Sequence, residues 1–87
     1  MSSGSGKIAI HNRIAMFRTE RGVSRRDLAE AVGVNPQTIG YLERGDYAPS
    51  LELGMRIAAW FDVPVETVFS FTPFPSLSDA LRRAGDL

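Results

Sequence analysis

The segment GVNPQTIGYLERG at residues 33–45 decides the fold. A glycine stands at each end, and glycine often ends a helix because its backbone turns left-handed at no steric cost. Asn35 is a favoured N-cap, and Pro36 falls at the first helical position, where a missing N–H is harmless. The segment therefore predicts a short, sharply bounded helix over residues 36–44.

A second short helix is predicted just before it, in SRRDLAEAVG. Ser24 and Asp27 form a capping-box pattern in which aspartate replaces the usual glutamate or glutamine. Leu28 and Val32 form one apolar face, and Gly33 ends the helix. The three-residue link at 33–35 forces the two helices to cross steeply, so residues 24–44 are expected to form a helix-turn-helix.

The two sides of the second helix differ in chemistry. At 100° per residue, Gln37, Tyr41 and Arg44 share one stripe, flanked by Thr38 and Gly40. Ile39 and Leu42 lie opposite and would anchor the helix. A glutamine can pair with an adenine edge in the major groove of DNA, and a tyrosine can pack on a thymine methyl or reach a phosphate. The outer side is therefore a candidate DNA-reading surface.

Helices are also predicted in the rest of the chain. Ile10, Ile14 and Phe17 recur at helical spacing before Gly22. Ser50 caps a helix whose buried stripe is Leu53, Ile57, Ala58 and Phe61, which leaves Trp60 partly exposed. A short helix follows at VETVF, with Val65, Val68 and Phe69 facing inward, and a last one could begin at Ser76. No convincing strand is seen, because residues 8–10 could add an edge but could not form a sheet alone.

Composition narrows the class of protein. The 87 residues suit one domain, and the chain has no cysteine and one histidine, His11. We therefore expect no disulfide, metal, cofactor or enzymatic activity. No apolar run approaches the ~18 residues of a membrane span, so we expect a cytoplasmic protein. The net charge is zero, but residues 1–27 carry +4 and residues 28–87 carry −4, so one face could still attract an anion.

The pattern of anchors resembles the Cro/CI-type, or Xre, family of helix-turn-helix regulators over about residues 12–71. The matching positions are Leu28–Ala29, Gly33, Ile39, Leu42–Glu43, Gly45, Pro49–Ser50, Ile57–Ala58 and Val63. The resemblance implies an all-α, compact five-helix, lambda repressor-like fold whose third helix enters the major groove. It also implies a DNA-binding regulator, expected to be a repressor, that usually binds a pseudo-palindrome as a homodimer.

The resemblance also implies the residues that contact double-stranded DNA. Arg25 stands where the family usually has glutamine, and an arginine there could contact a base or a phosphate. Arg18 and Glu43 occupy positions that form an internal ion pair in the family. The candidate DNA-binding residues are Arg25, Arg26, Asn35, Gln37, Thr38, Tyr41, Arg44 and Tyr47.

The expected organisation is a flexible arm at residues 1–9, a DNA-binding domain at 10–71 and an extension at 72–87. The end of the chain is unusually apolar, with Phe69, Phe71, Phe74 and Leu77. These side chains could cover the core or form a dimer contact. They also leave an alternative open, in which the fold serves as an antitoxin or another module that binds a protein partner.

Overall fold

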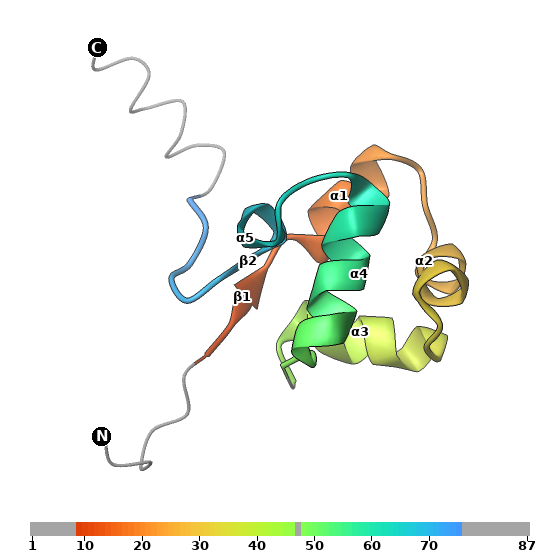
Figure 1. Cartoon of the computed structure of the whole chain (residues 1–87), viewed down its shortest axis with the longest axis horizontal. Helices are drawn as coiled ribbons and strands as arrows, with labels where there is room; N and C mark the ends of the chain where they lie inside the picture. The colour runs from red at the N-terminus through yellow and green to blue at the C-terminus, as the bar shows by residue number, and fades with distance from the viewer. Residues whose placement is uncertain (1–8, 47, 76–87) are drawn as a thin grey trace.

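The structure is a computed structural model that describes residues 9–46 and 48–75. Its elements are, in chain order, β1 (His11–Asn12), α1 (Ile14–Glu20), α2 (Arg25–Val32), α3 (Pro36–Arg44), α4 (Leu51–Phe61), α5 (Val65–Val68) and β2 (Phe69–Ser70) (Figure 1). The described part therefore confirms the predicted five-helix fold. Residues 1–8 of the expected arm and the helix expected from Ser76 lie outside the described residues.

Side-chain caps begin three of the helices. Ser24 Oγ accepts from the N–H of Asp27 at 3.0 Å, and Ser50 Oγ accepts from the N–H of Leu53 at 3.1 Å. Asn35 Oδ1 accepts from the N–H of Gln37 at 2.8 Å. Each bond satisfies an N–H that has no partner inside its helix. These local bonds explain why the helix starts could be predicted from sequence.

One core joins all five helices. Figure 1 shows α4 running through the middle of the molecule, and α4 contacts α2 and α5. The side chains of Ile14, Ile39 and Phe61 are fully buried. The guanidinium of Arg21 lies over the rings of Phe17 and Phe61, and its Nη1 donates to the Phe61 carbonyl at 2.6 Å. This contact ties the end of α1 to the end of α4.

A two-stranded ribbon was not predicted. β1 and β2 pair antiparallel, with His11 opposite Ser70 and Asn12 opposite Phe69. Strands of two residues are too short to show the alternating pattern by which a strand is found in sequence. Their partners are also far apart along the chain. The ribbon is therefore a product of the tertiary fold.

The predicted start of the first helix was wrong. Ile10 lies before β1, and α1 begins only at Ile14. The side chain of Asn12 explains the later start, because its Oδ1 accepts from the N–H of Ile14 at 3.1 Å while its Nδ2 donates to the Leu42 carbonyl at 2.8 Å. Asn12 therefore supports the first turn of α1 and ties it to α3.

The aromatic residues near the end of the described chain have different surroundings. Phe69 packs against the core as predicted, but it belongs to β2 and not to the preceding helix. Phe74 lies against the guanidinium of Arg13, 4.1 Å from the ring centroid. Phe71 is 72% exposed, and Trp60 is 40% exposed, as expected. Leu77 lies outside the described residues.

Candidate nucleic-acid interface

The turn between α2 and α3 brings two short helices into close contact. Ala29 is fully buried, and its carbonyl accepts from the N–H of Gly33 at 2.8 Å and from that of Val34 at 3.0 Å. Gly33 has φ +81°, a left-handed conformation that favours glycine. The side chain of Val34 packs against the core. The chain therefore turns sharply into α3, as predicted.

The two sides of α3 are divided as expected. Ile39 and Leu42 are buried and anchor the helix. Gln37 is exposed, Tyr41 is 42% exposed, and Thr38 is half-buried. Figure 1 shows α3 at the bottom of the molecule and α1 at the top. The outer side of α3 is thus accessible to a large ligand such as a DNA duplex.

A shallow depression of about 330 Å³ lies beside α3. Gly40 was expected only to flank the polar stripe, but it is buried and helps to line this depression. The guanidinium of Arg44 lies 5.1 Å from the ring centroid of Tyr41, and its Nε donates to Asp46 at 3.1 Å. The other lining residues are Arg25, Pro36 and Gln37. The sequence signal for this hollow is the glycine between longer side chains.

Glu43 links three helices beneath this surface. Its side chain is 4% exposed, and its carboxylate accepts from Arg18 Nε of α1 at 2.8 Å, which confirms the ion pair implied by the resemblance. It also accepts from Arg25 Nε of α2 at 2.9 Å, a contact that was not predicted. Burial raises the pKa of the Glu43 carboxyl, but the hydrogen bonds and charges of the two arginines outweigh burial and lower the pKa below its usual range.

The comparisons with known proteins agree with this geometry. A protein-family model described as helix-turn-helix matches residues 14–68. The chain belongs to this helix-turn-helix family. It is a small DNA-binding regulator of the Xre type, as the sequence pattern indicated.

Relatives of this helix-turn-helix regulator match over most of their length. An uncharacterised HTH-type transcriptional regulator of Archaeoglobus fulgidus is 42% identical over 62 residues, 71% of this chain and 89% of that protein. YgzD of Bacillus subtilis, also an uncharacterised HTH-type transcriptional regulator, is 41% identical over 58 residues, 67% of this chain and 88% of that protein. The structure of the clp gene regulator ClgR of Corynebacterium glutamicum superposes with a TM-score of 0.56 at 28% identity, covering 85% of this chain and 82% of that one.

Three candidate residues of the regulator remain, namely Arg26, Asn35 and Tyr47. Arg26 is exposed in the first turn of α2. The Oδ1 of Asn35 is used in the helix cap, so the group that Asn35 can offer to a ligand is its amide nitrogen. Tyr47 lies outside the described residues.

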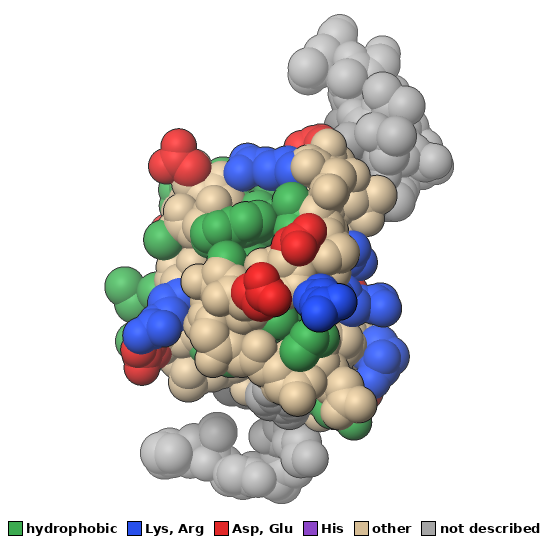
Figure 2. All heavy atoms as spheres, turned by 90° about the vertical axis from the view of Figure 1, so that its right-hand side faces the viewer, with side chains coloured by type: hydrophobic (Ala, Val, Ile, Leu, Met, Phe, Trp, Pro, Cys, Tyr) green, Lys and Arg blue, Asp and Glu red, His purple; other side chains and the backbone are tan. Residues whose placement is uncertain are grey.

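Charge is unevenly spread over the surface. Figure 2 views the molecule from the side of α2, and Arg side chains gather along the right edge of that view, with others at its top and left. Asp and Glu side chains lie nearer its middle and left. A molecule with no net charge can therefore present a basic edge to an anionic ligand.

The described residues, 9–46 and 48–75, contain no group of three histidine, cysteine, aspartate or glutamate side chains that could hold a metal ion. None of their helices has the length and apolar character needed to cross a membrane.

Proposed function

We propose that this regulator is a repressor that binds specific DNA sequences as a homodimer, with α3 in the major groove. The observation that carries this proposal is the orientation of α3. Its buried side is fixed by Ile39 and Leu42, and its opposite side presents Gln37 and Tyr41. A rigid helix that presents an amide and a phenol is suited to reading base edges.

We assign base contacts to Gln37 and Tyr41, with Thr38 beside them. Phosphate contacts are assigned to Arg26, Arg44 and Asn35, and to the backbone N–H groups at the start of α2. Phosphate contacts orient a protein on the duplex, whereas base contacts select the sequence. Tyr47 remains a candidate by sequence alone. We assign repression on the expectation that the bound protein blocks access to a promoter that overlaps its site. The function needs access to the chromosome, in keeping with the expected cytoplasmic location.

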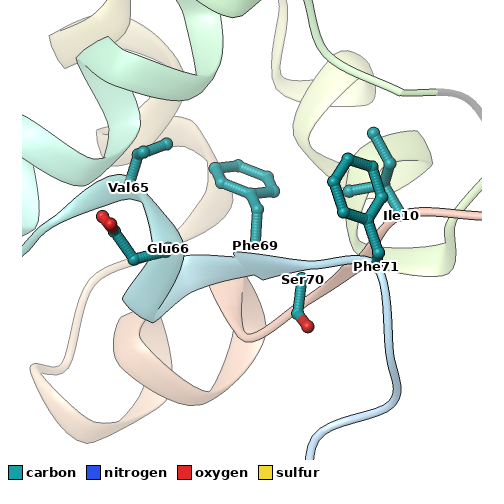
Figure 3. A pocket seen from close by; sticks show the side chains of 6 residues that line it. All are labelled: Ile10, Val65, Glu66, Phe69, Ser70 and Phe71. Atoms are coloured by element: carbon teal, nitrogen blue, oxygen red, sulfur yellow. The ribbon is translucent and has the colours of Figure 1, made fainter.

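The homodimer in this proposal is supported by an apolar surface beside the ribbon. A hollow of about 370 Å³ is lined by Ile10, Val65, Phe69 and Phe71 among others. Figure 3 shows the rings of Phe69 and Phe71 on the same side of β2, with Ile10 beside Phe71 and Ser70 pointing away. A projecting ring next to an apolar hollow suits a two-fold contact, since each copy can insert its Phe71 into the other.

The same surface could instead bind a different protein, as in the antitoxin alternative. A co-purifying partner in stoichiometric amount, with no DNA affinity at low salt, would favour that alternative. A homodimer that binds DNA favours the proposal.

The reading surface is tested by selecting binding sites from a random duplex library and measuring affinity by fluorescence polarisation. Gln37→Ala should lower the preference for the selected sequence roughly 5- to 150-fold, the range for one bidentate base contact of 1–3 kcal/mol. Tyr41→Ala should relax the selected sequence at a neighbouring position. Affinity should fall steeply with salt as phosphate contacts are screened.

Met16→Ala is the matched control, because the exposed fraction of Met16, 45%, is similar to the 42% of Tyr41, but Met16 lies on α1. It should leave both sequence and affinity unchanged. If Gln37→Ala and Tyr41→Ala also select the wild-type sequence with wild-type affinity, α3 is not the reading helix.

A further inference from the structure

We propose that Arg25 reads a guanine in the depression beside α3, held in position by Glu43. This inference rests on the proposed function and adds to it one base, guanine, and the residue that contacts this base, Arg25. Arg25 is the first residue of α2, yet it lines the depression together with Gln37 and Tyr41 of α3. The reading surface therefore extends from α3 to a side chain of the neighbouring helix.

Glu43 holds the Arg25 side chain at one edge. Arg25 Nε donates to Glu43 Oε1 at 2.9 Å, and the carboxylate is itself buried and anchored by Arg18. A guanidinium is planar and carries five N–H donors in a rigid fork. With Nε engaged, the edge formed by Nη1 and Nη2 remains to meet a ligand. Its two parallel donors match the O6 and N7 acceptors of guanine in the major groove.

The local charge favours a base edge over a phosphate. Arg25 shares its carboxylate partner with Arg18, so the three side chains together carry a charge of +1 where the two arginines alone would carry +2. A nearby carboxylate weakens the attraction of an arginine for an anion. It does not weaken the directional fit to a polar, uncharged base. The Arg25 side chain is nevertheless 53% exposed and accessible to DNA.

Two residues of α3, Pro36 and Gly40, leave space for a base edge and offer it no side-chain hydrogen bond. Pro36, the first residue of α3, has a side chain without hydrogen-bonding atoms, so it cannot read a base through a hydrogen bond. Gly40 adds no side chain to the depression, which leaves about 330 Å³ for a base edge to enter. At this part of the surface, the hydrogen-bond donor supplied by α2 is Arg25.

The test compares binding sites selected from a random duplex library by the full-length wild type, Arg25→Lys and Arg25→Ala. Lysine keeps the charge and can still pair with Glu43, but it lacks the fork. We expect the wild type to select a guanine in each half-site, Arg25→Lys to select it less strongly and Arg25→Ala to lose the preference, while both variants keep the bases read by Gln37 and Tyr41. Replacing this guanine by 7-deazaguanine should weaken wild-type binding severalfold and leave binding by the Arg25→Ala variant unchanged.

Arg26→Ala is the comparison for a phosphate contact. It should weaken binding to all duplexes alike. The slope of log affinity against log salt concentration should fall by about the amount expected for one phosphate contact. If Arg25→Ala behaves in the same way, Arg25 contacts phosphate and the inference is overturned. If the wild type selects no sequence, the proposed function fails and this inference with it. Thermal melts by circular dichroism check that each variant is folded.

Discussion

At the scale of single residues, Glu43 matters most to the candidate interface. Its carboxylate lies where α1, α2 and α3 meet, and it pairs with Arg18 and Arg25. A buried carboxylate without partners would be costly, so the two arginines and Glu43 depend on one another. The pair with Arg18 follows from the family resemblance, but the pair with Arg25 required coordinates, because nothing in the local sequence aims Arg25 at α3.

The lowered pKa of Glu43 predicts a specific dependence of stability on pH. The ordinary pKa of a glutamate carboxyl is 4.5. Since the folded pKa lies lower, ionised Glu43 stabilises the fold fully above that value, and the contribution is lost as pH falls through the folded pKa. Glu43→Gln should reduce the free energy of unfolding by about 1.5–3 kcal/mol at pH 7. The difference from wild type should shrink below about pH 4.

Urea unfolding of both proteins between pH 7 and pH 3 measures this difference. Other titrating groups are common to both chains, so the difference isolates position 43. A difference that stays constant over this range would show that the carboxylate is not linked to folding as proposed.

At the scale of elements, most helix boundaries follow from local chemistry. The caps at Ser24, Asn35 and Ser50 form as predicted, and Gly33 and Gly45 end their helices with positive φ. These bonds and angles involve residues within a few positions of each other. The exception is α1, whose start depends on Asn12 and on its bond to the distant Leu42 carbonyl.

Two glycines of the helix-turn-helix are predicted to respond in opposite ways to alanine. Gly33 has φ +81°, so Gly33→Ala should reduce the free energy of unfolding by about 1–2 kcal/mol. Gly40 lies within α3, and an added Cβ would lie 3.5 Å from Arg44 Nη1, an ordinary contact. Gly40→Ala should therefore raise the free energy of unfolding by about 0.5–1 kcal/mol.

Chemical denaturation measures both changes. Gly40→Ala should at the same time weaken DNA binding, because its methyl group reduces the depression that we assign to a base edge. A shift in stability of the same sign for both variants would contradict this account of the two glycines.

At the scale of the whole molecule, the ribbon pairs a segment near the start of the described chain with a segment near its end (Figure 1). It positions Phe71 at the surface beside the hollow lined by Ile10 and Val65. The aromatic end of the chain is thereby divided, because Phe69 covers the core and Phe71 does not. Sequence alone left both roles open for these residues.

If Phe71 forms the dimer contact, Phe71→Glu should yield a monomer, since a charge cannot enter an apolar hollow without a large cost. Light scattering coupled to size-exclusion chromatography measures the mass. The variant should also lose affinity for a palindrome with half-sites one helical turn, about 34 Å, apart, while binding a single half-site like the wild type.

Leu51→Glu is the matched control, because Leu51 is 75% exposed but lies on α4. It should leave the dimer intact. If the wild type is a monomer, the homodimer in the proposal is wrong. If Leu51→Glu breaks the dimer and Phe71→Glu does not, the dimer contact lies on α4.

The sequence by itself determined the helices, their caps, the buried stripes and the outward side of α3, because these depend on neighbours one to four positions apart. Tertiary structure alone decided the contact of Arg25 with Glu43, the depression around Gly40 and the pairing of β1 with β2. Each of these joins residues from separate elements. The contacts between these elements depend on how the whole core packs, and the pattern of residues along one helix does not predict them.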